Sequence, residues 1–206
     1  MNPGTTEQPK RPYELGKRLE QMDRSRAAIL SAARAQLEGQ GYRRMTMASL
    51  AAESGITRQT IHNLFGTKTG VLEALFDAIA LDGGMDGMRE AMTQSSQDAM
   101  LEHFVKVFCR FWTANRLLLR RVHGIGAIDP ELGAVLEARN RRRFTAATRV
   151  VARFGVREKT EQRAAALAAL TSFEFFDTLA VDELDAQQAE AQILDLARKL
   201  LATPTV

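Results

Sequence analysis

The chain has 206 residues, of which 45% are hydrophobic and 26% are charged. These values are ordinary for a globular protein that buries a core as one medium domain or two small ones. A single cysteine excludes an intramolecular disulfide and any zinc site built on several cysteines. No apolar run approaches the ~20 residues of a membrane-spanning helix. Residues 1–18 contain no hydrophobic segment, so we expect no secretory signal and a cytoplasmic protein.

Charge is distributed unevenly along the chain. Residues 1–70 contain 11 Lys and Arg against 6 Asp and Glu, whereas residues 71–206 contain 17 against 19. The net charge of +3 therefore comes from the first third, which is the part that would attract a polyanion.

The periodicity of apolar residues is helical throughout, and the sequence predicts an all-α fold. Prolines occur only at positions 3, 9, 12, 130 and 204, so the long interior stretches are free of helix breakers. We expect a flexible basic arm over 1–21, which either contacts DNA or merely increases solubility. The expected helices of an N-terminal domain over 22–81 span 22–39, 47–53, 57–65 and 68–81.

The glycine-rich stretch 81–88 is the expected boundary to a larger helical domain over 82–206. Gly155 and the pairs Asp129-Pro130 and Asp185-Ala186 indicate where helices begin or end. The expected helices of this domain span 97–114, 116–123, 130–153, 158–181 and 186–202.

Residues 46–65, TMASLAAESGITRQTIHNLF, have the spacing of a helix-turn-helix. Ala51 is small where a second helix must cross the first, and Gly55 can adopt the positive φ of a tight turn. Leu50 and Ile61 fall at offsets that would pack the two helices together.

The opposite face of the second helix carries side chains suited to base edges. A helix of about nine residues is roughly 13 Å long, and a major groove about 12 Å wide admits it. Thr46 and Lys68 begin the flanking helices, where free N–H groups and the helix dipole favour phosphate. The alternative is an amphipathic surface helix whose polar face only meets water. The candidate DNA contacts are Arg44, Thr46, Thr57, Arg58, Gln59, Thr60, His62, Asn63 and Lys68.

These residues, in this order, resemble the N-terminal domain of the tetracycline-repressor (TetR) family over about residues 25–80. The resemblance rests on Gly41, Thr46, Leu50-Ala51, Gly55-Ile56-Thr57, Ile61–Phe65, Gly66-Thr67-Lys68 and Val71-Leu72. It implies a homodimer with a three-helix DNA-binding head and a larger ligand-binding body. In that family the position of His62 is commonly Tyr, and that of Gly70 is often acidic or Ala.

The second domain contains an aromatic stripe in HFVKVFCRFW, residues 103–112, that either forms ordinary core or lines a pocket. The family resemblance implies a pocket among the middle helices. The candidate pocket residues are Phe104, Phe108, Trp112, His123, Arg143 and Phe176. RNRRRF, residues 139–144, is expected to be a solvated face with Glu137 supporting Arg141. The alternative is that one arginine turns inward to hold a ligand carboxylate.

The last two expected helices are candidates for a dimer interface. The helix over 158–181 is rich in small residues, and Ile193, Leu196 and Leu200 share a stripe on the next. Two such helices from each protomer would form a four-helix bundle, whereas the alternative is that they only cover their own core.

An enzyme is not predicted, because the chain has no glycine-rich phosphate loop, no Gly-x-Ser-x-Gly and no His-Glu-x-x-His. No cofactor or metal is expected, and Cys109 is expected to be a core residue. We predict a repressor that binds a palindromic operator in double-stranded DNA as a homodimer. A small, largely apolar effector would release it by tilting the helix at 68–81. The rival is a ligand carrier or helical interaction protein whose head does not bind DNA.

Overall fold

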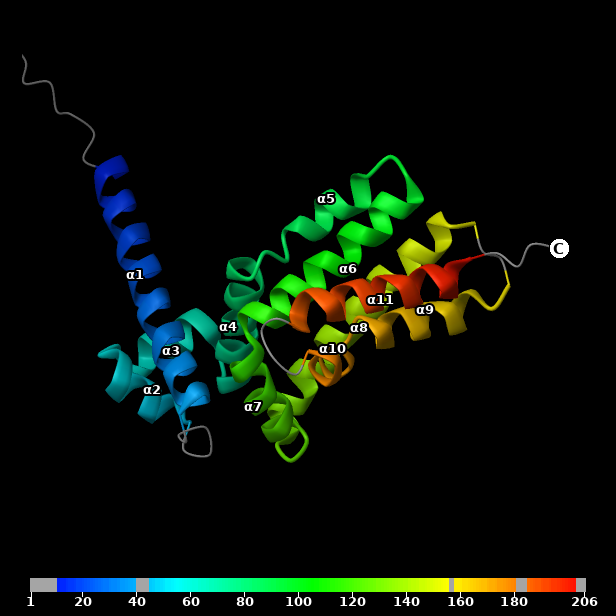
Figure 1. The fold of residues 1–206 in the computed structure, drawn as a ribbon. Coiled ribbons are helices and arrows are strands. Elements are labelled where there is room, and N and C mark those ends of the chain that lie inside the picture. Colours follow the sequence, from blue (N-terminus) through cyan, green and yellow to red (C-terminus); the bar gives the residue numbers. More distant parts are fainter. Residues whose placement is uncertain (1–10, 40–44, 156–157, 181–184, 203–206) are drawn as a thin grey trace, which may run out of the picture. The chain divides into compact units, whose positions relative to one another are not determined.

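The computed structural model describes residues 11–39, 45–155, 158–180 and 185–202, in which every regular element is a helix (Figure 1). The all-α prediction is therefore confirmed. The chain divides into two compact units, Met1–Ala74 and Leu75–Val206. The predicted boundary near residue 82 falls inside the second unit. Within the described ranges, no helix has the length and apolar character needed to span a membrane.

The first unit consists of α1 (Arg11–Glu38), α2 (Met47–Ser54), α3 (Arg58–Phe65) and the beginning of α4 (Lys68–Asp82). Helix α2 packs against both α1 and α3. The side chains of Ile29, Leu37, Leu50 and Ile61 are fully buried. The Arg26 guanidinium lies over the Phe65 ring, 5.0 Å from its centroid, and so ties α1 to the end of α3.

Helix α1 is longer than predicted, and the expectation of a flexible arm up to residue 21 is wrong from residue 11 onward. Pro12 stands in the first turn, where the missing N–H costs no hydrogen bond. Helix-forming residues then follow. Leu19 and Met22 are 56% and 51% exposed, so local helix propensity rather than packing holds these turns within the described chain. Residues 1–10 of the predicted arm lie outside the described residues.

The helix-turn-helix is defined by caps at each helix end. Thr46 Oγ1 accepts from the Ser49 N–H at 3.0 Å, while the Thr46 N–H donates to Ser49 Oγ at 2.9 Å. Gly55 ends α2 with φ of 70°, as predicted, and its N–H donates to the Ala51 carbonyl. Thr57 then caps α3 by accepting from the Thr60 N–H.

The second unit contains the end of α4 and seven further helices in its described part. These are α5 (Gly87–Thr93), α6 (Gln97–Ala114), α7 (Arg116–Gly126), α8 (Pro130–Arg153), α9 (Thr160–Leu170), α10 (Phe173–Leu179) and α11 (Asp185–Leu201). Helix α6 packs against α5 and α11, and α8 packs against α7 and α9 (Figure 1). Cys109 is a core residue, as predicted, and burial raises the pKa of its thiol to about 12.

The helix predicted over 158–181 is wrong, because α9 and α10 are separate helices that meet at Thr171-Ser172. The Thr171 hydroxyl donates to the Leu167 carbonyl, and Ser172 Oγ accepts from the Phe175 N–H. The Thr171 carbonyl accepts from the Trp112 indole N–H at 3.1 Å. Hydroxyls and an indole thus satisfy backbone groups that an unbroken helix would pair internally.

Gly70 is required by close approach between α3 and α4. A Cβ at position 70 would overlap the carbonyl oxygen of Phe65. We expect Gly70→Ala to lower the free energy of unfolding by about 1–3 kcal/mol, the typical range for overpacking. Urea unfolding followed by far-UV circular dichroism measures this change.

Gly16→Ala is the matched control in the same unit, because nothing lies within 4 Å of a Cβ at Gly16. Alanine at an open helical site should stabilise, by up to about 0.5–1 kcal/mol. Equal urea midpoints for the two variants would contradict the steric role of Gly70.

Candidate DNA-binding face and candidate effector cavity

Helix α3 turns its polar side chains toward solvent and its apolar side chains into the first unit. Ile61 is fully buried, whereas Arg58, Gln59, His62 and Asn63 are exposed. The candidate DNA-contacting side chains of α3 therefore share one open surface, which we call the α3 face (Arg58, Gln59, His62, Asn63). Met47 of α2 joins three of them around an open depression lined by Met47, Arg58, Gln59 and His62.

Hydrogen bonds orient two members of the α3 face. Gln59 Nε2 donates to Asn63 Oδ1 at 2.9 Å, which leaves the Gln59 carbonyl oxygen and the Asn63 amide NH₂ directed to other partners. His62 Nδ1 lies 2.6 Å from the Gly66 carbonyl, which can only accept, so the ring carries its proton on Nδ1. A neutral His62 consequently presents Nε2 as an acceptor.

The remaining DNA-contact candidates lie at helix starts. The Thr46 and Thr57 hydroxyls serve as caps of α2 and α3, and the Thr57 and Thr60 hydroxyls lie 2.9 Å apart. Lys68 is the first residue of α4, and Thr67 Oγ1 just before it accepts from the Gly70 N–H. Arg44 lies outside the described residues.

A cavity of about 280 Å³ lies within the second unit. Four of the six candidate pocket residues line it, namely Phe108, Trp112, His123 and Arg143. Phe104 and Phe176 do not line it, because both are completely buried in the core. The cavity is also lined by Phe76, Ala80, Met85, Met88, Phe111, Leu119, Leu136, Arg139, Asn140, Arg142 and Ala146.

One wall of the cavity is a packed aromatic cluster from α6. The Phe108 and Trp112 rings stack with centroids 5.9 Å apart, and Phe111 tilts against Trp112 at 4.9 Å. The hydrogen bond from the Trp112 indole to Thr171 fixes its ring orientation. Met85 and Met88, which the sequence analysis missed, come from the glycine-rich stretch that had been interpreted only as a linker.

Helix α8 contributes three arginines to a cavity surface that is otherwise mainly apolar. The expectation that residues 139–144 form a wholly solvated face is wrong, because Arg139, Arg142 and Arg143 line the cavity. Arg141 and Arg142 nevertheless have exposed side chains, and Arg141 pairs with Glu137 at 2.6 Å as predicted. The offsets i, i+3 and i+4 place three arginines on one side of a helix, and Arg141 on another.

The arginines of this wall differ in their partners. Arg139 and Arg142 approach the same carboxylate oxygen of Asp77, at 2.9 and 3.5 Å. Arg143 Nε donates to the Ala168 carbonyl at 3.1 Å instead. Burial lowers the pKa of Arg143, which reflects the cost of removing its guanidinium from water.

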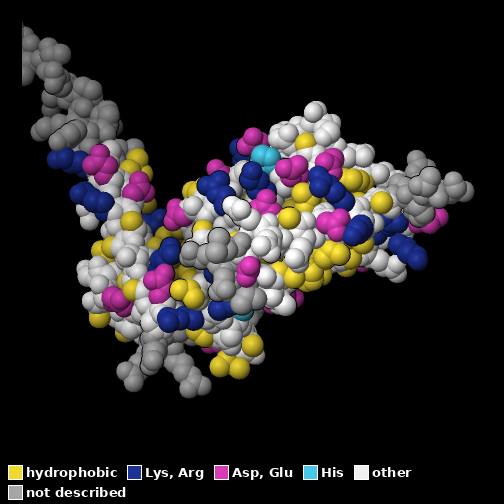
Figure 2. Space-filling model, viewed as in Figure 1, with side chains coloured by type: hydrophobic (Ala, Val, Ile, Leu, Met, Phe, Trp, Pro, Cys, Tyr) yellow, Lys and Arg dark blue, Asp and Glu magenta, His cyan; other side chains and the backbone are white. Residues whose placement is uncertain are grey.

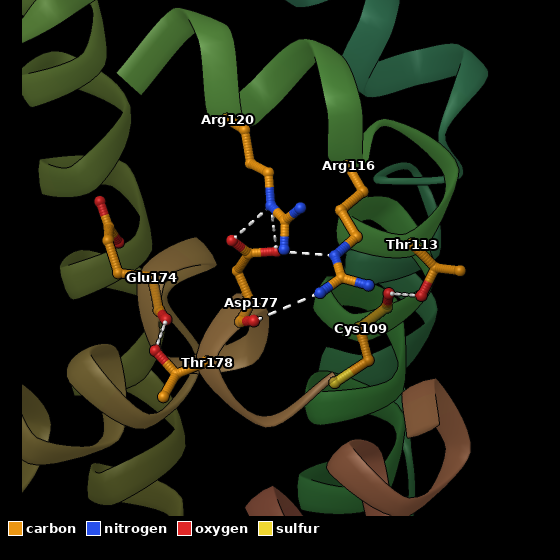
Figure 3. A network of polar contacts seen from close by, with 7 residues as sticks. All are labelled: Cys109, Thr113, Arg116, Arg120, Glu174, Asp177 and Thr178. Carbon is orange, nitrogen blue, oxygen red and sulfur yellow. Dashed lines mark hydrogen bonds and ion pairs between the residues drawn. The ribbon is translucent and has the colours of Figure 1, made fainter. Parts of the chain in front are cut away.

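Helices α7 and α10 are joined by ion pairs beside the cavity (Figure 3). Arg116 and Arg120 both donate to Asp177, with Nε–O distances of 2.6 and 2.8 Å. Burial raises the pKa of Asp177, but the hydrogen bonds from the two arginines outweigh it, and the net pKa is lowered.

His123, which lines the cavity, contacts Glu174 through its Nδ1 at 2.6 Å. The hydrogen bond from His123 lowers the pKa of Glu174 from 4.5 to about 2, although burial opposes it. The carboxylate of Glu174 is therefore already engaged by a protein group, and it does not line the cavity.

A helix-turn-helix unit with an exposed polar second helix, followed by a helical unit that contains a cavity, defines a DNA-binding regulator. Residues 29–75 match the family described as "Bacterial regulatory proteins, tetR family". The chain is a member of the TetR family of regulators. No curated protein sequence matches it significantly.

Solved structures share the fold at low sequence identity. A putative TetR-family regulator from Syntrophomonas wolfei has a TM-score of 0.68 at 15% identity, covering 88% of this chain and 97% of its own. The SmeT–triclosan complex has 0.64 at 20% identity, covering 88% and 96%. A putative regulator from Saccharomonospora viridis in complex with choline has 0.58 at 17% identity, covering 83% and 94%.

The pair of His123 and Glu174 predicts a pH-dependent contribution to stability. Since its pKa is lowered in the folded state, ionised Glu174 stabilises the fold above about pH 4.5, and that contribution is lost as pH falls toward 2. We expect the difference in urea midpoint between the unmodified protein and Glu174→Gln to be largest near pH 5–6 and to shrink steadily below pH 4.5.

Glu137→Gln is the matched control, since it removes an exposed partner of Arg141 whose pair is a surface i, i+4 contact. Its midpoint should stay close to that of the unmodified protein. A Glu174→Gln difference that stays constant from pH 6 to pH 3 would contradict this assignment.

Proposed function

We propose that the protein is a ligand-responsive transcriptional repressor that binds a palindromic operator as a homodimer. The main support for this proposal is the amphipathic character of α3. Its residue Ile61 is fully buried, while the α3 face is exposed. The apolar side of this helix is packed in the core, and its amide and guanidinium groups face solvent. Such a helix can insert into a major groove.

Within this proposal the α3 face reads base edges. Arg58 is suited to guanine, while Gln59 and Asn63 are suited to adenine. Because Gln59 and Asn63 are hydrogen-bonded to each other, they would act as one reading unit rather than as two independent contacts. Neutral His62 would accept from a base amino group through Nε2, whereas a phosphate contact would require its protonated form.

The helix starts would position the protein on the backbone. The first N–H groups of α2 and α4 have no partner within their own helices, and Lys68 adds a positive charge at the start of α4. Since Thr46 and Thr57 use their hydroxyls as caps, we propose that they contribute to DNA binding mainly by fixing those helix ends.

We propose that dimerisation uses α9 and α11, along which Figure 2 shows hydrophobic side chains at the surface. Ile193 is fully buried and so serves its own core, but Leu196 is 39% exposed and Leu200 is half-buried. Ala165 and Ala169 of α9 are exposed and small, which allows close approach of a second helix. This surface would form the four-helix bundle between protomers.

The cavity is the proposed effector site. Helix α4 contributes Phe76 and Ala80 to its lining, and the same helix begins at Lys68 in the DNA-binding unit. A ligand that displaced the end of α4 would therefore bias the helix that carries a DNA contact. Moving the population from 99:1 to 1:99 requires about 5.5 kcal/mol of preference for the released state. The structural neighbours with triclosan and choline support a small effector.

The operator-reading role of α3 predicts distinct effects for two kinds of residue. Gln59→Ala and Asn63→Ala should each cost about 1–3 kcal/mol of operator binding and relax specificity at the same base positions. The double variant should cost less than the sum, because the two side chains form one unit. Lys68→Ala should weaken binding to all sequences about equally. Enrichment from random DNA followed by fluorescence anisotropy measures both effects.

Arg149→Ala is the matched control for loss of one positive charge, since Arg149 is exposed on α8 in the second unit. It should leave binding nearly unchanged. Unchanged specificity in Gln59→Ala and Asn63→Ala would refute the assigned reading face. Failure of the unmodified protein to retard any DNA at low salt would favour the ligand-carrier alternative.

The dimer proposal is tested by sedimentation at micromolar concentration. We expect a dimer that Leu196→Glu weakens at least tenfold, because a carboxylate would be buried against the partner helix. Leu117→Glu is the control, since Leu117 is 76% exposed on α7. A monomer, or equal effects of the two variants, would remove the proposed interface.

A further inference from the structure

The two walls of the cavity differ sharply in chemistry, and this asymmetry bears on what the cavity binds. The α6 wall is aromatic, with Phe108 stacked on Trp112 and Phe111 tilted against Trp112. The α8 wall provides three arginines, and no Asp or Glu lines the cavity. A purely apolar ligand would complement only the first wall.

Arg143 is the arginine whose charge is least compensated. It is half-buried, and its Nε donates to a neutral carbonyl, that of Ala168. Among the described residues, no carboxylate oxygen lies within 4.0 Å of it, and its two terminal nitrogens form no hydrogen bond with the protein. Each guanidinium has five N–H donors in a planar fork that matches a carboxylate.

The nearby carboxylates are already committed to other groups. Asp77 is shared by Arg139 and Arg142. Glu174 is held by His123, and it influences Arg143 only at longer range. Three arginines thus line the cavity, and the nearest paired carboxylate, that of Asp77, lies outside the lining. A ligand with one negative charge would reduce this excess of positive charge.

We infer that the effector is a small amphiphile with one carboxylate, whose acid group binds Arg143 and whose apolar part lies against Phe108, Phe111 and Trp112. This inference rests on the proposed role of the cavity as the effector site. A volume of about 280 Å³ lies near the lower end of ligand pockets and favours a compact molecule. A cationic effector would face the arginines without a carboxylate in the lining, so its binding is disfavoured.

The inference can be tested without DNA, because Trp112 is the one tryptophan of the chain and lines the cavity. Titration of the full-length protein with octanoate, followed by Trp112 fluorescence and calorimetry, should show saturable binding. Octanamide has nearly the same shape without the charge, and it should bind at least tenfold more weakly. Loss of a charged hydrogen bond typically reduces affinity by about ten- to hundredfold.

Variants of α8 locate the acid group. Arg143→Gln should weaken octanoate binding by about ten- to hundredfold and should leave octanamide binding almost unchanged. Arg141→Gln is the control on the same helix, because Arg141 is exposed and pairs with Glu137 outside the cavity. Thermal unfolding checks that each variant is folded. The comparison of octanoate with octanamide on the unmodified protein needs no variant and stands if Arg143→Gln does not fold.

The possible outcomes separate this inference from the proposed function. Equal affinity for octanoate and octanamide, binding of neither, or equal effects of the two substitutions would overturn it. A separate measurement adds octanoate to the protein–operator complex. Binding of octanoate at Arg143 without operator release would support the inference while contradicting the ligand-responsive repressor. Release of the operator by a neutral ligand, with no preference for octanoate over octanamide, would support the ligand-responsive repressor and contradict this inference.

Discussion

The packing of Ile61 beneath α3 is the constraint on which DNA recognition by this chain depends. Ile61 and Leu50 are both fully buried, and Gly55 provides the left-handed residue that lets two short helices meet with these side chains in contact with one core. Once Ile61 is inside, the helical repeat places Gln59 and Asn63 on the opposite side. Arg58, at the start of the helix, and His62 are also exposed. The caps at Thr46 and Thr57 hold the starts of both helices, so the exposed face is presented on a rigid support.

The second unit uses its polar contacts in a different way. Ion pairs from Arg116 and Arg120 to Asp177 join α7 to α10 (Figure 3). A contact between His123 and Glu174 joins the same two helices. Asp177 and Glu174 are engaged by these residues of α7, and neither carboxylate forms an ion pair with an arginine of α8 in the described part of the chain. The cavity lining therefore has arginines but no acidic residue, because the neighbouring acidic side chains form contacts with residues of α7.

The fold of the first unit was largely predictable from the sequence because its signals are local. A small residue, a glycine and two apolar residues at fixed offsets specify the turn, and threonines indicate the caps. The start of α1 was missed because residues 1–21 were expected to be a flexible basic arm, whereas a proline in a first turn is compatible with helix. The role of Gly70 was not predicted: its lack of a side chain permits the close approach of the Phe65 carbonyl.

The cavity was predictable only in part, because its lining depends on contacts between distant segments. Phe108 and Trp112 were found through the aromatic stripe, but the same stripe suggested Phe104, which lies one turn deeper in the core. Helical spacing does not show which residues of a buried stripe line a cavity and which pack in the core. Residues 139–144 were expected to be a solvated face, with one inward arginine as the alternative. Three consecutive arginines sample more than half of the helix circumference, so spacing alone could not identify Arg143 as the less exposed one.

The hydrogen bond from Trp112 to the Thr171 carbonyl links two positions 59 residues apart in the chain. At the corner between α9 and α10 this carbonyl accepts from an N–H of α6, and phenylalanine at position 112 would supply no donor. Replacement of the indole by phenylalanine would leave a buried carbonyl without its hydrogen bond and would also change the cavity that Trp112 lines.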